Sequence, residues 1–182
     1  GWLSFHADSV LTGLIPVPNG GANWQRLLAD ARFWQDTLQT GRFALISVGL
    51  ELLLALAIAL LLDQRWRGRA AVRALTLLPW ALPTTRMALG WRWIFNTPYG
   101  PLEQLAKALG LPALNLLADP GWAWLATVMA DVWKTTPFIT LILLAGLQTI
   151  PADLFEAFRL EGGRPLQALR TITLPLLVPY IL

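Results

Sequence analysis

The sequence predicts an all-α protein of the polytopic transmembrane class, a bundle of apolar helices joined by short polar segments. Charged residues make up 14% of the 182 residues and hydrophobic residues 55%, whereas a soluble domain carries about a quarter charged residues. Ten tryptophans suit the two membrane–water interfaces. The chain has no cysteine, which excludes disulfides and thiolate metal sites. It also lacks a basic stripe of the kind that binds nucleic acid.

Three apolar segments have about the ~20 residues that a spanning helix needs. They are residues 43–62, 74–95 and 122–147. The second is interrupted by Pro79 and Pro83. Prolines free backbone carbonyls, which within a membrane must find partners in protein or water.

We expect the chain to be a fragment of one transmembrane domain, residues 1–182. It begins with glycine rather than methionine, and it shows no charged leader followed by a short apolar core. Residues 173–182 are apolar but too few to span. The domain is therefore expected to be truncated at the start of a further helix.

Arginine placement predicts the orientation, because cytoplasmic loops are enriched in Lys and Arg. Residues 63–73 carry four arginines, and residues 151–171 carry three more. Residues 96–121 carry a single lysine. We therefore expect the first two segments in the cytoplasm and the third outside.

Apart from Arg92 near the end of the second span, four charged residues fall within the predicted spans: Glu51, Arg86, Asp131 and Lys134. Charges inside a membrane face protein or a cavity and commonly mark a pathway. They can equally be structural, with Glu51 paired to Arg86 and Asp131 to Lys134, which stand three apart on one helical face. Both explanations stay open at this point.

A polar island at residues 151–172 predicts a helix–turn–helix hairpin. Asp153 and Glu156 have the spacing of a capping box, so a helix should begin near Asp153. Gly162 lies where a left-handed residue would end that helix, and Pro165 fits the first turn of the next. The second helix should carry an apolar stripe on one face, formed by Leu166, Leu169 and Ile172.

The hairpin resembles the EAA signature of ABC importer permeases. Glu156-Ala157-Phe158, three residues, Gly162, nine residues and Ile172-x-Leu174-Pro175 match its spacing, with Phe158 in place of the second alanine. Glu161-Gly162 is similar to the Asp-Gly of sugar permeases. Other segments are similar to the same group: Asn23-Trp24, Arg32-Phe33-Trp34, residues 78–83 and residues 91–96.

This resemblance implies a MetI-like permease core that lacks its first helix in this chain, within the transmembrane subunit of an ATP-driven, binding-protein-dependent sugar importer. It implies a bacterial or archaeal inner membrane, a second permease subunit forming a heterodimer, an extracytoplasmic solute-binding protein and a cytoplasmic ABC ATPase dimer. No catalytic residue, metal or directly bound cofactor is expected, and ATP would belong to the partner, since the chain has no Walker-type loop. The residues expected to contact the ATPase or shape the hairpin are Glu156, Ala157, Phe158, Glu161, Gly162, Ile172, Leu174 and Pro175.

Two other classes of function are weighed against the importer. An ion-coupled secondary transporter would use Glu51 and Asp131 to carry protons or sodium, and its uptake would stop when the ion gradient collapses. A membrane-embedded enzyme would need clustered histidines, cysteines or paired carboxylates at one cavity, and no recognised motif surrounds the two acids.

Overall fold

The computed structural model describes residues 1–7, 13, 15–64, 66–112 and 115–181. The chain is almost entirely helical and divides into two units, residues 1–45 and 46–182, each described here by itself. Helix α2 (Ala31–Asp63) begins in the first unit and continues into the second. Arg65 of the predicted cytoplasmic loop and Leu182 of the last apolar segment lie outside the described residues.

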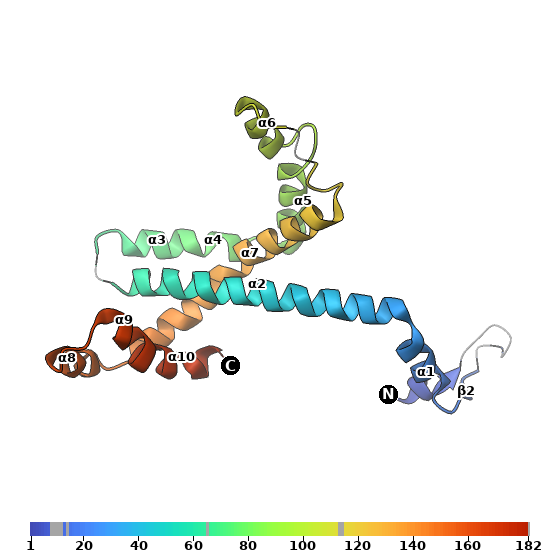
Figure 1. Cartoon of the computed structure of the whole chain (residues 1–182), viewed down its shortest axis with the longest axis horizontal. Helices are drawn as coiled ribbons and strands as arrows, with labels where there is room; N and C mark the ends of the chain where they lie inside the picture. The colour runs from blue at the N-terminus through green and yellow to red at the C-terminus, as the bar shows by residue number, and fades with distance from the viewer. Residues whose placement is uncertain (8–12, 14, 65, 113–114, 182) are drawn as a thin grey trace. The chain divides into compact units, whose positions relative to one another are not determined.

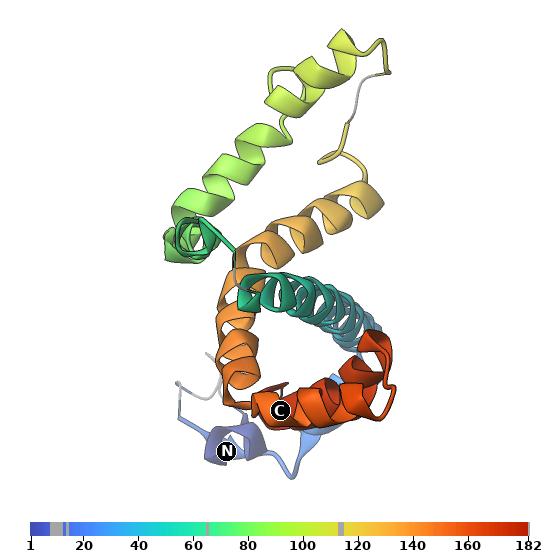
Figure 2. The same ribbon diagram turned by 90° about the vertical axis from the view of Figure 1, so that its left-hand side faces the viewer.

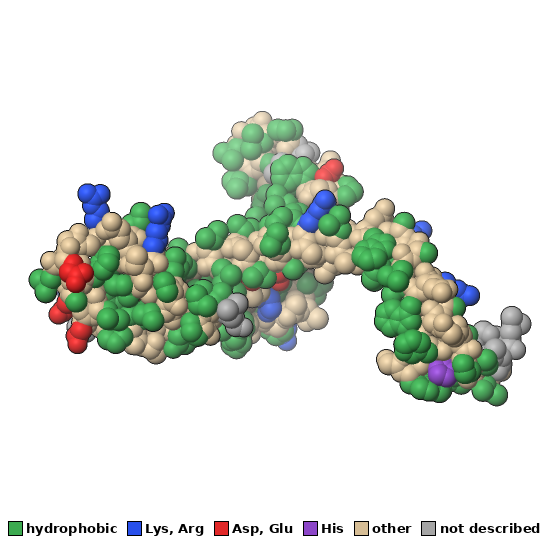
Figure 3. Space-filling model, turned by 60° about the horizontal axis from the view of Figure 1, so that its bottom comes forward, with side chains coloured by type: hydrophobic (Ala, Val, Ile, Leu, Met, Phe, Trp, Pro, Cys, Tyr) green, Lys and Arg blue, Asp and Glu red, His purple; other side chains and the backbone are tan. Residues whose placement is uncertain are grey.

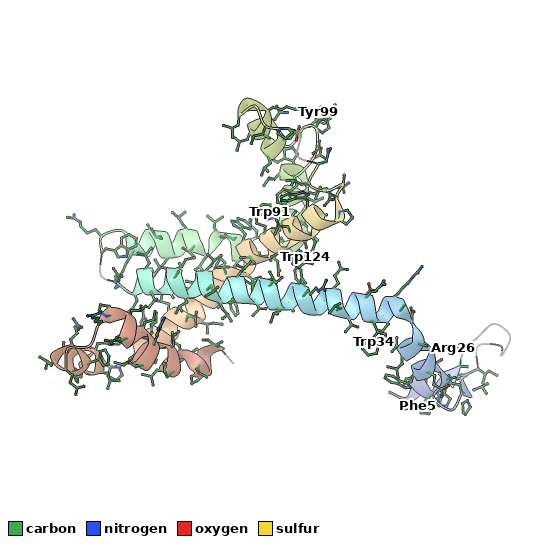
Figure 4. The ribbon with its side chains drawn as sticks, in the orientation of Figure 1. Phe5, Arg26, Trp34, Trp91, Tyr99 and Trp124 are labelled. Atoms are coloured by element: carbon green, nitrogen blue, oxygen red, sulfur yellow. The ribbon has the colours of Figure 1, made fainter. Side chains whose placement is uncertain are left out.

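The first unit pairs a short hairpin with a helix. Its elements are η1 (Trp2–Phe5), β1 (His6–Ala7), β2 (Val17–Pro18) and α1 (Ala22–Ala29). The strands are antiparallel, with His6 opposite Pro18. The Asn23 side chain donates to the backbone oxygens of Ser4 and His6, at 3.2 and 2.9 Å. Phe5, Arg26 and Trp34 of this unit are labelled in Figure 4.

The second unit is built from the end of α2 and the helices that follow it (Figure 1). They are α3 (Arg69–Thr76), α4 (Leu78–Ala81), α5 (Thr84–Ile94), α6 (Pro101–Ala108), α7 (Pro120–Thr149), α8 (Ala152–Leu160), α9 (Pro165–Ala168), the π-helical segment η3 (Leu169–Thr173) and α10 (Leu174–Ile181).

Two of the described helices, α2 and α7, are long and apolar enough to cross a membrane by length and composition. Their most apolar windows have mean hydropathies of 2.7 and 1.4. The predicted spans 43–62 and 122–147 lie inside these two helices. Both helices extend beyond the predicted limits, because polar residues at their ends continue the helical backbone.

The predicted span 74–95 is broken within the segment, as its prolines indicated, and its crossing of the membrane stays a prediction. The segment is broken into the end of α3, then α4 and α5. Leu82 is extended (φ −72°, ψ 134°), because the ring of Pro83 disfavours a helical conformation in the residue before it. Pro79, by contrast, lies in the first turn of α4, where its missing N–H breaks no hydrogen bond.

The arginine-rich loop connects α2 to α3. Gly68 is left-handed (φ +92°) and precedes α3. The Arg73 guanidinium donates from Nη2 to the carbonyl of Leu62, at 3.1 Å. An arginine at this place satisfies a carbonyl that the end of α2 leaves without a helical partner.

The core of the second unit lies where α2, α7 and α10 meet (Figure 2). Small residues on α2 allow close approach, and Ala55 and Ala59 are fully buried. The α7 face that joins them carries Leu143, Leu144 and Leu147, and α10 adds Leu177. A Cβ atom placed on Gly146 of α7 would lie 2.8 Å from the side chain of Leu177. Burial of this apolar face holds the last helices against α7.

Candidate functional site

The predicted hairpin forms, but its first helix begins differently from the prediction. Helix α8 starts at Ala152, with Pro151 as its N-cap and no side-chain cap. The expected capping box between Asp153 and Glu156 is therefore wrong. Pro151 takes an extended backbone (φ −61°, ψ 133°) directly before the helix, so Asp153 falls inside the first turn. There its negative charge can still interact favourably with the positive end of the helix dipole.

The turn of the hairpin has the predicted left-handed glycine. Gly162 has φ +83°, and its N–H donates to the carbonyl of Arg159 at 3.0 Å. The N–H of Gly163 donates to the carbonyl of Phe158 at 2.9 Å. These two hydrogen bonds form a Schellman motif, which caps the carboxyl end of α8.

The side chain of Phe158 packs directly against Gly163. A Cβ atom on Gly163 would coincide with Cδ1 and Cε1 of the phenyl ring. Phe158 is half-buried, as is Gly163. Glycine is thus favoured at position 163 because the Phe158 ring takes the space of a side chain, and not because of the backbone conformation there. The sequence analysis did not predict this contact.

The returning half of the hairpin begins at Pro165, as predicted, and leads through η3 into α10. The predicted stripe is wrong at Leu166, whose side chain is 60% exposed. Further along, Leu169 is half-buried, and Thr173 and Leu177 are buried, at spacings of four. The signature residues on this half differ in exposure: Ile172 and Leu174 are half-buried and Pro175 is exposed.

The outer face of α8 is exposed and partly apolar. Glu156, Ala157 and Glu161 are all exposed. Leu154 and Leu160 are 44% and 90% exposed and flank Ala157 at spacings of three, which puts the three on one helical face. Figure 3 shows acidic side chains gathered over this hairpin, at the left of the view. The sequence analysis missed the two leucines, although their spacing was legible.

The four membrane charges do not form the ion pairs that were considered. These residues are all described, and neither Glu51 with Arg86 nor Asp131 with Lys134 lies within 4.0 Å. Glu51 is buried, with 3% of its surface exposed. The structural-pair explanation is therefore wrong for both pairs, and the pathway explanation stays a prediction.

Lys134 instead bridges two helices. Its Nζ donates to the backbone oxygen of Leu82, at 2.8 Å. Leu82 ends α4 at the break before Pro83, where no following helical N–H reaches its carbonyl. The freed carbonyl of Leu82 thus has the partner that the sequence argument required, in a side chain 52 residues further along the chain.

An aromatic cluster lies at the same contact between α4, α5 and α7. Trp80 and Phe138 stack with ring centroids 5.5 Å apart and planes 12° apart. Trp91, labelled in Figure 4, meets Trp133 edge-on at 5.6 Å. A pocket of about 330 Å³ lies beside the second pair and is lined by Leu82, Arg86, Met87, Gly90, Trp91, Ile94 and Trp133.

Replacing Lys134 with methionine should weaken the contact between α4 and α7. We expect the free energy of unfolding to fall by about 1–3 kcal/mol, because the Leu82 carbonyl loses a charged donor. Lys134→Arg keeps a donor and should recover most of the loss. Thermal unfolding of the purified protein measures both. Equal stability of the methionine variant and the wild type would contradict the bridging role.

The fold is shared with a solved structure. The structure matches the crystal structure of a bacterial alginate ABC transporter in complex with an alginate pentasaccharide-bound periplasmic protein. The TM-score is 0.74 at 23% sequence identity, over 90% of this chain and 57% of the matched chain. At this identity the likeness shows the fold alone: this chain shares the helical fold of a chain in that transporter.

The chain belongs to the family described as binding-protein-dependent transport system inner membrane component, whose model matches residues 51–182. It is 43% identical over 181 residues to the trehalose/maltose transport system permease protein MalF of Thermococcus litoralis, covering 100% of this chain and 61% of that protein. It is 35% identical to the sulfoquinovosyl glycerol transport system permease protein SmoG of Agrobacterium fabrum, covering 99% of this chain and 58% of that protein. The chain therefore spans about three fifths of the length of these relatives.

Proposed function

We propose that this chain is part of the transmembrane permease subunit of an ATP-driven sugar importer that depends on a solute-binding protein. The family match carries the proposal. The relatives named above transport saccharides or their glycosides by their printed names, which supports a saccharide as the substrate. The importer would contain a second permease subunit, an extracytoplasmic binding protein and a cytoplasmic ATPase dimer.

The hairpin would couple the permease to the ATPase. On its inner side Phe158 packs on Gly163 of the same hairpin, and its outer side presents Leu154, Ala157 and Leu160 beside acidic residues. An exposed apolar helix face of this kind fits a groove on a partner. A large exposed leucine such as Leu160 is costly to leave in water, which favours its burial in a complex.

The translocation pathway would lie at the contact of α4, α5 and α7. Aromatic faces there can stack on the apolar face of a sugar ring, and polar groups beside them can fix its orientation. Arg86 lines the adjoining pocket, and Glu51, Asp131 and Lys134 place further polar groups on α2 and α7. We propose these four residues as pathway residues.

Leu160→Asp should abolish coupling while leaving the permease inserted in the membrane. The charge would be buried in the ATPase groove, which costs several kcal/mol when it has no partner. We expect the ATPase to be lost on co-purification and sugar uptake to fall at least tenfold. Leu105→Asp is the matched control, because Leu105 is 59% exposed but lies on α6. Unchanged ATPase retention in Leu160→Asp would contradict docking through this face.

The energy source separates the importer from an ion-coupled transporter. Uptake of radiolabelled trehalose or maltose should require ATP and the binding protein in vesicles that contain the whole complex. Collapse of the proton and sodium gradients should leave the initial rate unchanged at constant ATP. Uptake that stops with the gradients would overturn the proposed function.

A further inference from the structure

A large pocket lies on the inner side of the hairpin. Its volume is about 800 Å³, and it is enclosed by the carboxyl ends of α2 and α7, by α8 and by the α9–η3 segment. The residues that line it are Leu60, Asp63, Gln64, Leu147, Phe155, Phe158, Arg159, Gly163, Arg164, Pro165, Leu166, Ala168, Leu169 and Thr173. The pocket is separate from the outer α8 face and from the aromatic cluster.

The lining combines an apolar interior with two cationic groups. Leucine and phenylalanine side chains form most of the wall, while Arg159 and Arg164 come from the two sides of the hairpin turn. The Nε of Arg159 donates to the Phe155 carbonyl at 3.2 Å, which orients the base of its guanidinium. Neither arginine forms an ion pair with a described acidic residue, and Asp63 is the one carboxylate among the lining residues.

The pocket is at the level where two apolar helices end. Helix α2 ends at Asp63 and α7 at Thr149, and residues next to both ends line the pocket. Where spanning helices end, the surroundings change from acyl chains to lipid headgroups. A ligand here would have hydrocarbon on one side and the polar headgroup layer on the other.

We propose that this pocket binds an anionic phospholipid, with the lipid phosphate between Arg159 and Arg164 and an acyl chain along the apolar wall. Basic pockets between membrane helices on the cytoplasmic side suit such headgroups, and guanidinium groups bind phosphate through paired hydrogen bonds. The bound lipid bridges the hairpin to α2 and α7. The site rests on the membrane setting of the family and is independent of the identity of the transported sugar.

Lipid binding by the purified transporter complex tests the site. The complex is delipidated in detergent and titrated with phosphatidylglycerol or phosphatidylcholine, and bound lipid is counted by native mass spectrometry. We expect a saturable phosphatidylglycerol site. Its affinity should fall about fivefold in Arg159→Gln or Arg164→Gln and about 25-fold in the double variant. Arg170→Gln is the matched control, because Arg170 belongs to the same hairpin and does not line the pocket.

The other outcomes each overturn the proposal. Equal binding of phosphatidylcholine would remove the role of the headgroup charge, and equal affinity in the double variant would place the lipid elsewhere. Displacement by inorganic phosphate alone would make the site one for a free anion. Binding to the isolated permease but not to the complex would show that a protein segment fills the pocket. Sugar uptake is measured separately, so its absence would count against the proposed function and not against the lipid site.

Discussion

Gly163→Ala is expected to destabilise the hairpin more than Gly162→Ala, although Gly162 is the residue with the left-handed backbone. The methyl group at position 163 would occupy the place of the Phe158 ring, and displacing that ring should cost about 2–3 kcal/mol, as overpacking does. A Cβ on Gly162 meets nothing within 4 Å, so its cost is only the backbone strain, about 1 kcal/mol.

A double-mutant cycle isolates the contact. Phe158→Ala should restore most of the stability of Gly163→Ala and none of the stability lost in Gly162→Ala. Thermal unfolding of the purified protein gives the energies, and ATPase co-purification shows whether the displaced ring also disturbs docking. Additive effects of Phe158→Ala and Gly163→Ala would contradict the packing described here.

Gly146→Val should separate α10 from α7. The added atoms would meet Leu177 and Tyr180, whose nearest side-chain atoms both lie 2.8 Å from the first added carbon. We expect the free energy of unfolding to fall by about 3 kcal/mol. The 3.2 Å contact between the hydroxyls of Thr149 and Tyr180 should be lost as well. Gly49→Val is the control, since nothing lies within 4 Å of a Cβ at Gly49 in α2.

Cysteine accessibility reports the separation directly, because the chain has no native cysteine. Leu177 is fully buried, so Leu177→Cys should react slowly with a maleimide in the background of Gly49→Val and much faster in that of Gly146→Val. Slow labelling in both backgrounds would show that α7 tolerates the larger side chain at position 146.

Local chemistry explains what the sequence could predict. The turn at Gly162 and the helix start at Pro165 depend on backbone preferences of neighbouring residues, and both were predicted. The start of α8 at Ala152 lies next to the predicted Asp153, but the capping box is absent because Pro151 occupies the N-cap position. The break within residues 74–95 was indicated by its prolines, and it lies at Leu82, directly before Pro83.

Contacts between distant segments were beyond the reach of the sequence. Asp131 and Lys134 share a helix face, and spacing alone favoured a pair, yet Lys134 binds the carbonyl of Leu82. The choice depends on how α4 packs on α7, which no periodicity encodes. The approach of Phe158 to Gly163 depends in the same way on the rotamer of the ring. The exposure of Leu160 could have been anticipated from its spacing to Leu154 and Ala157.

The π-helical turn at residues 169–173 fixes the direction in which the hairpin faces. An α-helix advances 100° per residue, and a π turn accommodates one residue more than an α turn over the same rise. The azimuth of the hairpin about the α10 axis is therefore set by the number of residues between Pro165 and Leu174. Removing one residue from the π turn would restore an α turn and leave the outer face of α8 nearly where it is, whereas removing one from the α-helical part of the return would rotate that face by about 100° without altering a single side chain on it.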